Sequence, residues 1–153
     1  MNYWDLIDTA FDHVDTYDGA SSFFKDFAPL SSPVQHLLAA HWCQSEVNNG
    51  GFDQFFRNSA GVLAPEAEVA FRAIGLAQVA ELLSEAMKRF GVPYPRERDE
   101  RQLAMEAIPS DGSRAFGGAG RRFADLDDRF YKLLPGSEFD KHADAYATMH
   151  GGR

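Results

Sequence analysis

The sequence has a single cysteine, Cys43, among its 153 residues. One cysteine forms no internal disulfide and supplies no cluster of thiolate metal ligands, which favours a reducing compartment. No apolar run approaches the ~20 residues of a membrane-spanning helix, and the first residues carry Asp5 and Asp8 where a signal peptide would carry basic residues. We therefore expect a cytoplasmic protein with no membrane partner.

β-branched residues are also scarce. Val, Ile and Thr together supply 13 residues, whereas Ala occurs 21 times and Leu 12 times. This balance favours helices over strands, and no stretch alternates between apolar and polar residues as a half-buried strand does. The composition alone therefore predicts helices.

Basic residues are outnumbered, at 15 against 23 acidic ones, for a net charge of −8. This balance argues against direct nucleic-acid binding, because such proteins gain most of their affinity from Lys and Arg at the phosphates. A basic protein partner fits better. The chain is 44% hydrophobic with 13 Phe, enough apolar material for one folded domain.

Apolar residues at steps of three and four predict the helices. We expect an all-α fold, a single compact domain of about seven helices that spans residues 1–153. In the first part of the chain we expect a helix over 4–14 that Asp18-Gly19 ends, an aromatic turn over 23–27, a helix over 33–47 capped by Ser32, and a short helix over 52–58. Helices over 65–74 and 76–90 follow. In the last part we expect a surface loop over 92–101, a short helix over 102–108, a second surface loop over 109–120, a helix over 123–134 and a helix over 138–149 capped by Ser137.

No catalytic residue, metal site or cofactor is indicated. His36, His41 and Glu46 are five residues apart, which turns successive side chains by about 140° around a helix and separates them. The glycine-rich segment 116–122 lacks the preceding strand and the Lys of a phosphate-binding loop. The stretch 125–128 lacks the glycine and the final Glu of a calcium loop, so we expect it to be the solvated start of a helix.

Five aspartates near the amino terminus are the first candidate site. Asp5, Asp8, Asp12 and Asp15 step by three, four and three, with Asp18 just beyond. This spacing would place four like charges along one helix face, where they repel one another. Residues 1–60 hold eight acidic and two basic side chains, a net charge of −6. The series is either a solvated face that aids solubility or a negative surface that attracts a basic partner.

The second candidate is the segment EVNNGGFDQFFRNSAG, residues 46–61. Two asparagines and two glycines predict a helix end and a tight turn, followed by a short helix with inward Phe rings. Asn58 is expected to adopt a left-handed cap. These polar residues either satisfy the turn locally or form a small-ligand or enzymatic pocket from Asn49, Gln54, Arg57 and Asn58. The complete motif consists of Asn48, Asn49, Gly50, Gly51, Phe52, Gln54, Arg57 and Asn58.

This segment resembles the DNA-mimic-protein-19-like family, a bacterial family mostly of unknown function whose named member is a DNA-mimic protein. The following APEAEVAFRAIGLAQVAELL and, more loosely, LDDRFYKL are similar too. The resemblance implies an all-helical fold and an acidic, dimeric protein that occupies the DNA-binding surface of a transcription factor or other DNA-binding protein. The sequence therefore predicts an acidic protein-interaction module, more readily than an enzyme.

Overall fold

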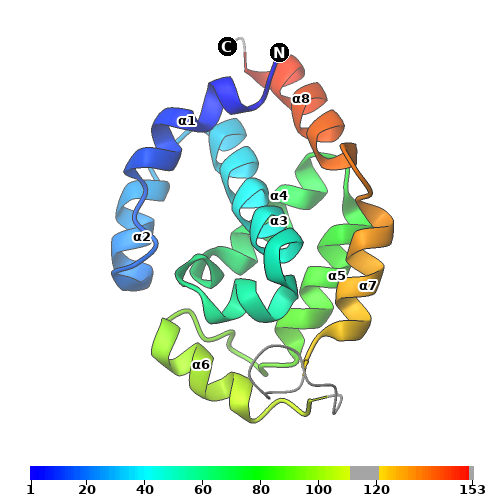
Figure 1. Ribbon diagram of the computed structural model, residues 1–153. Coiled ribbons are helices and arrows are strands. Elements are labelled where there is room, and N and C mark those ends of the chain that lie inside the picture. Colours follow the sequence, from blue (N-terminus) through cyan, green and yellow to red (C-terminus); the bar gives the residue numbers. More distant parts are fainter. Residues whose placement is uncertain (111–120, 152–153) are drawn as a thin grey trace.

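The computed structural model describes residues 1–110 and 121–151, which form eight α-helices and a short 3-10 helix but no strand (Figure 1). The predicted all-α domain is confirmed. The elements are α1 (Trp4–His13), α2 (Gly19–Phe27), α3 (Ser32–Arg57), η1 (Ser59–Leu63), α4 (Ala64–Ala73), α5 (Ala77–Lys88), α6 (Arg98–Glu106), α7 (Ala124–Leu133) and α8 (Glu138–His150).

Helix α3 runs through the middle of the fold and contacts α1, α4, α6, α7, α8 and η1 (Figure 1). Four consecutive residues of this helix, 37–40, are completely buried. Because four successive positions cover the whole circumference of a helix, neighbours must enclose α3 on all sides at this level. The core therefore forms around α3.

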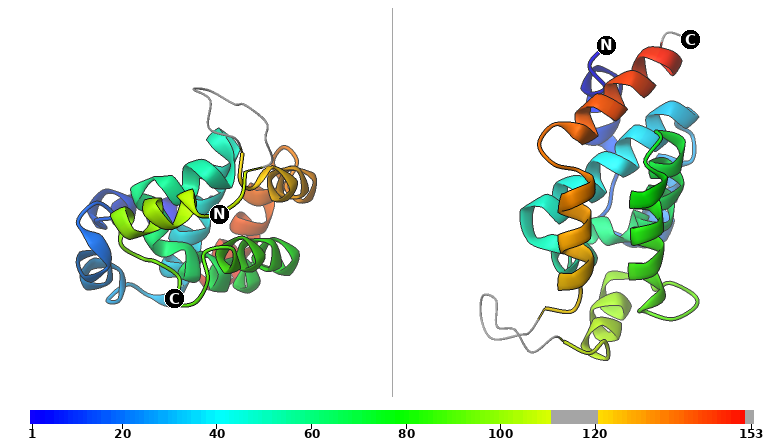
Figure 2. Two further views of the ribbon diagram at one scale, coloured as in Figure 1. Left: turned by 90° about the horizontal axis from the view of Figure 1, so that it is seen from below. Right: turned by 90° about the vertical axis from the view of Figure 1, so that its right-hand side faces the viewer.

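The two ends of the molecule are held by different contacts. The start of α1 lies beside the end of α8, and α6 lies at the opposite end (Figures 1 and 2). At the first end, the Met1 amino group donates to the Thr148 hydroxyl at 3.1 Å, and the Tyr3 amide donates to Asp144 at 2.7 Å. Near α6, buried Phe rings fill the core, among them Phe52, Phe56 and Phe123.

The predicted aromatic turn over 23–27 is wrong, because these residues lie in α2. Phe23 and Phe27, four residues apart, stack with a centroid distance of 4.8 Å and are buried together. The segment was too short for its spacing to indicate a helix. The helix cap predicted at Ser32 is Ser31, and the predicted loop over 92–101 ends early because α6 starts at Arg98.

The glycine-rich segment that we compared with a phosphate-binding loop falls mostly in 111–120, outside the described residues. Among the helices that are described, none combines the length and apolarity needed to span a bilayer.

Candidate functional site

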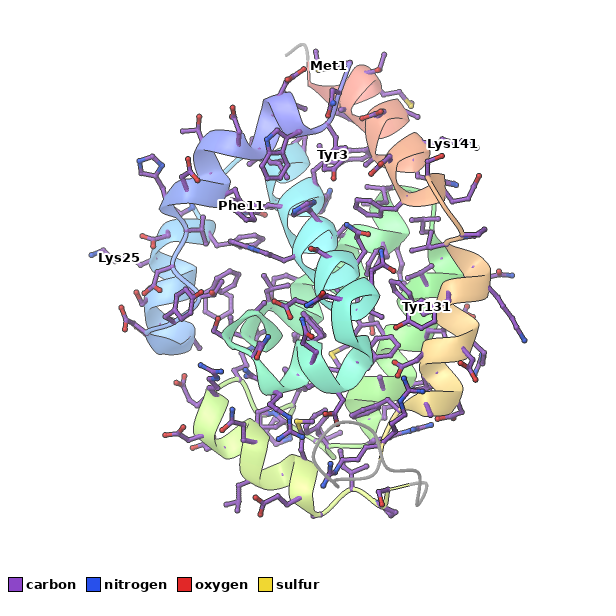
Figure 3. The ribbon with its side chains drawn as sticks, viewed as in Figure 1. Met1, Tyr3, Phe11, Lys25, Tyr131 and Lys141 are labelled. Carbon is purple, nitrogen blue, oxygen red and sulfur yellow. The ribbon has the colours of Figure 1, made fainter. Side chains whose placement is uncertain are left out.

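Three aspartates form a stripe on the outer face of α1. Asp5, Asp8 and Asp12 are all exposed, whereas Ile7 and Ala10 on the same helix are buried. Figure 3 shows Tyr3 and Phe11 on the side of α1 that faces α3. Within residues 1–110 and 121–151, no Lys or Arg pairs with any of these three carboxylates. We call Asp5, Asp8 and Asp12 the α1 stripe.

Asp15 does not continue this stripe, which corrects the predicted row of four. Helix α1 ends at His13 because the backbone turns to an extended conformation at Val14. In the following turn, Asp15 accepts hydrogen bonds from the Tyr17 amide at 2.7 Å and the Ser22 hydroxyl at 2.8 Å. The bond from Tyr17 is the main reason that the pKa of Asp15 is lowered. Asp15 therefore holds the turn together.

Asp18 has a different place from the one predicted. It stands at the N-cap position of α2 and does not end α1. Interaction with the neighbouring Asp15 carboxylate is the first cause that raises the pKa of Asp18. The side chain is exposed, so its charge adds to the acidic surface around the α1 stripe.

The family-like turn is a sharp break within α3. Gly50 (φ −156°, ψ 23°) and Gly51 (φ 75°, ψ −178°) leave the helical conformation, and the helix resumes at Phe52. The positive φ at Gly51 requires glycine. The predicted helix end is confirmed in position, and Figure 1 shows the change in direction of α3.

A buried carboxylate fixes this break from another helix. Asp127 on α7 is 3% exposed and accepts a hydrogen bond from the Phe52 amide at 2.8 Å. A Cβ atom at Gly51 would lie 2.5 Å from the Asp127 carboxylate. Burial raises the pKa of Asp127 to about 6. The expectation that residues 125–128 form a solvated face is therefore wrong at Asp127, which acts as a cap from a distance.

Two of the four predicted pocket residues meet at Glu46. The amides of Gln54 and Asn58 donate to the same oxygen, Glu46 Oε2, at 2.9 and 3.0 Å. Asn48 donates instead to Gln44 at 2.8 Å, and Asn49 is exposed and lines a surface depression together with Glu46 and Gln54. Gln54 and Asn58 thus meet at a carboxylate that the pocket prediction omitted.

Arg57 lies apart from this group. Its guanidinium pairs with Asp53 one turn earlier at 3.1 Å and is exposed. Asn58 has an extended backbone (φ −86°, ψ 169°), which contradicts the predicted left-handed cap. The predicted pocket therefore contains Asn49 and Gln54, with Asn58 beside it and Arg57 outside.

Arg101 was predicted in a surface loop and is instead completely buried. Its guanidinium donates to the backbone carbonyls of Phe56 at 2.6 Å, Asn58 at 2.7 Å and Arg96 at 2.7 Å. Two of these carbonyls lie at the C-terminal end of α3, where the helix dipole favours a cation. Burial lowers the pKa of Arg101. Arg101 is a structural residue that ties α6 to α3.

The histidines of α3 have separate surroundings, as their spacing predicts. His36 contacts the Tyr146 hydroxyl at 2.7 Å, and His41 contacts the Tyr3 hydroxyl at 2.9 Å. Burial lowers the pKa of His41 to about 4. No group of three metal-binding side chains occurs in the described parts of the chain.

The family resemblance of residues 46–61 is confirmed by a comparison with known protein families. The model of the DMP19-like protein family matches residues 28–150. The chain belongs to the DMP19-like protein family. No curated protein and no solved structure matches it. In this DMP19-like chain, the matched residues include the α3 break, Glu46, Arg101 and Asp127, whereas the α1 stripe precedes them.

The residues that sequence reasoning missed share one property. Asp127 and Arg101 are charged side chains that bind backbone groups at the break and at the end of α3, 75 and 43 to 45 residues away along the chain. Local spacing carries no signal for such contacts. Gly51 and Gly61 were the available hints, because a Cβ at either position would lie 2.5 Å from one of these side chains.

Proposed function

We propose that this chain is an acidic protein-interaction module that binds the basic surface of a DNA-binding protein in the place of DNA. The observation that carries the proposal is the α1 stripe. Its three carboxylates are exposed on one helix face and have no basic partner within the described residues. Over the seven residues from Asp5 to Asp12, α1 advances about 10 Å, so the charges form a row.

The energetics of the stripe support a role in binding. Like charges three and four residues apart destabilise a helix by a few tenths of a kcal/mol per pair. This repulsion opposes folding, and a cationic partner would relieve it. Long-range attraction would also speed the encounter with a basic surface.

Aromatic side chains border the stripe and offer apolar contact area. Trp4 is 37% exposed and lies against Phe11 and His41, with centroid distances of 5.2 and 4.9 Å. An exposed aromatic ring beside carboxylates suits an arginine-rich surface, because a guanidinium stacks on the ring while it pairs with a carboxylate.

The resemblance to a family with a DNA-mimic member supports the same partner class: a transcription factor or another DNA-binding protein. A cytoplasmic location and a homodimer belong to this proposal as well. The dimer is tested by light scattering during size-exclusion chromatography, in which a monomeric mass would reject it.

The test compares two triple variants of equal charge. One carries Asp5→Asn, Asp8→Asn and Asp12→Asn. The control removes three exposed carboxylates from α5 and α6 by Glu81→Gln, Glu100→Gln and Glu106→Gln. Partners are captured from the native cell at low and high salt, and their affinities are then measured with purified protein. The proposal predicts weaker binding and a shallower salt dependence only for the α1 variant. Equal loss in both variants would contradict it.

A small-ligand site at the α3 break is the second candidate function. The observation that favours it is the convergence of Gln54 and Asn58 on Glu46 beside an open depression. The chemistry of that depression allows a more specific statement about its ligand.

A further inference from the structure

A polar depression of about 420 Å³ lies on the α3 break. Its size falls in the range of small-molecule sites, about 300–1,000 Å³. All of its lining residues belong to α3 and to the part of the chain that matches the family: Gln44, Ser45, Glu46, Asn48, Asn49 and Gln54. The α1 stripe contributes nothing to it.

The break gives this depression a helix end. In an uninterrupted helix the Phe52 amide would donate to the Asn48 carbonyl, but here it donates to Asp127. The Val47 carbonyl accepts instead from the Tyr131 hydroxyl at 2.8 Å, and Figure 3 shows Tyr131 directed from α7 toward α3. The regular hydrogen-bond ladder of α3 is therefore interrupted at the break, next to the depression.

Glu46 adds a full negative charge at the same place. Both amide donors, from Gln54 and Asn58, reach its Oε2 atom, and no hydrogen bond to Oε1 occurs within the described residues. The depression itself is lined by no Lys or Arg. Glu46 Oε1 therefore remains available to a cationic ligand, and the side-chain carbonyl oxygens of Asn49 and Gln54 are further acceptors at the same site.

We propose that this depression binds a guanidinium group, with Glu46 as the anchoring carboxylate. A guanidinium is a planar cation with five N–H donors, and it suits a carboxylate surrounded by further acceptors better than an ammonium point charge does. The guanidinium comes either from a free small molecule or from an arginine side chain of a partner protein.

The experiment titrates the full chain with three probes while amide NMR shifts are recorded for the residues of the depression. The probes are methylguanidine, a short peptide with one central arginine, and methylamine. The proposal predicts that the guanidinium probes shift these resonances and bind more tightly than methylamine. Tighter binding of methylguanidine would indicate a free ligand, and tighter binding of the peptide a protein arginine; either result supports a guanidinium site.

Two variants test the assignment to Glu46. Glu46→Gln keeps the size of the side chain but removes its charge, and we expect affinity to fall roughly tenfold, about the value of a charge-assisted hydrogen bond. Ser45→Arg places a tethered guanidinium at an exposed lining position and should abolish binding without disturbing the fold. Glu106→Gln on α6 is the matched control and should bind normally.

The proposal is overturned if neither guanidinium probe shifts these resonances, if methylamine binds as tightly, or if Glu46→Gln and Ser45→Arg both bind like the wild type. Because the site does not include the α1 stripe, the variant with Asn at positions 5, 8 and 12 should still bind the guanidinium probes. Failure of one proposal is therefore distinguishable from failure of the other.

Discussion

The Asp127 carboxylate accepts a hydrogen bond from the Phe52 amide at 2.8 Å across 75 positions of sequence. This bond caps the second half of α3 and lets the helix break at Gly50 and Gly51. The break in turn brings Glu46, Gln54 and Asn58 together. A charged residue of α7 thus organises the polar face of α3.

Asp127→Asn should relieve the energetic cost of a buried charge and still accept the Phe52 hydrogen bond. The folded state raises the pKa of Asp127 from 3.8 to about 6, so it binds a proton more tightly than the unfolded state does. Wild-type stability therefore decreases as pH rises through this window. Urea unfolding should show the Asn variant at least as stable as the wild type at about pH 7.5 and its advantage smaller at about pH 5. An advantage that grows on acidification would contradict this role.

Gly51→Ala should destabilise the fold by about 2–4 kcal/mol, because it adds a strained positive φ and a Cβ beside the Asp127 carboxylate. Gly91→Ala is the matched control. Gly91 has a φ of 87° but open space around it, so this variant should cost only the backbone strain, about 1 kcal/mol. Chemical denaturation measures both losses. Equal losses would show that the approach of Asp127 to Gly51 is unimportant.

Arg101→Met should lower the free energy of unfolding by about 2–4 kcal/mol, because three backbone carbonyls lose a buried donor. Arg101→Lys should recover only part of this loss, since an ammonium cannot reproduce the guanidinium fork. Arg72→Met, at an exposed position of α4, should change stability little. A wild-type-like Arg101→Met variant would contradict the structural role of Arg101.

His41 should make stability depend on pH in the opposite direction from Asp127. Burial lowers the pKa of His41 from 6.5 to about 4, so the unfolded state binds the proton more tightly. Stability should therefore decrease as pH falls from about 6.5 to about 4. His41→Gln should remove this loss, whereas Asp127→Asn should make the acid loss steeper. If unfolding free energy fell equally steeply with acidification in the two variants, the opposite pH effects assigned to His41 and Asp127 would be contradicted.

The sequence predicted the elements whose apolar residues repeat over several turns. The helix over 76–90 corresponds to α5 (Ala77–Lys88), and the Gly50-Gly51 break lies where two glycines indicated it. Helix α2 was missed because its two inward Phe residues span a single turn. Short helices are stabilised mainly by tertiary packing, which local spacing does not report.

The candidate sites were predicted less completely than the fold. The exposure of Asp5, Asp8 and Asp12 followed from their spacing on α1, but the end of that helix at His13 moved Asp15 into a turn. The burial of Asp127 and Arg101 was missed because charged residues usually lie at the surface. Their burial depends on backbone groups of α3 that only the folded chain brings near.

The central claim is that the α1 stripe takes the place of DNA on a basic protein. The most direct measurement uses a captured DNA-binding protein, a fluorescent duplex bound to it, and anisotropy as this chain is added. We predict that the wild type and the Glu81, Glu100 and Glu106 control variant displace the duplex, and that the Asp5, Asp8 and Asp12 variant does not. Displacement by all three proteins, or a duplex that stays bound while the wild type binds elsewhere, would contradict the account.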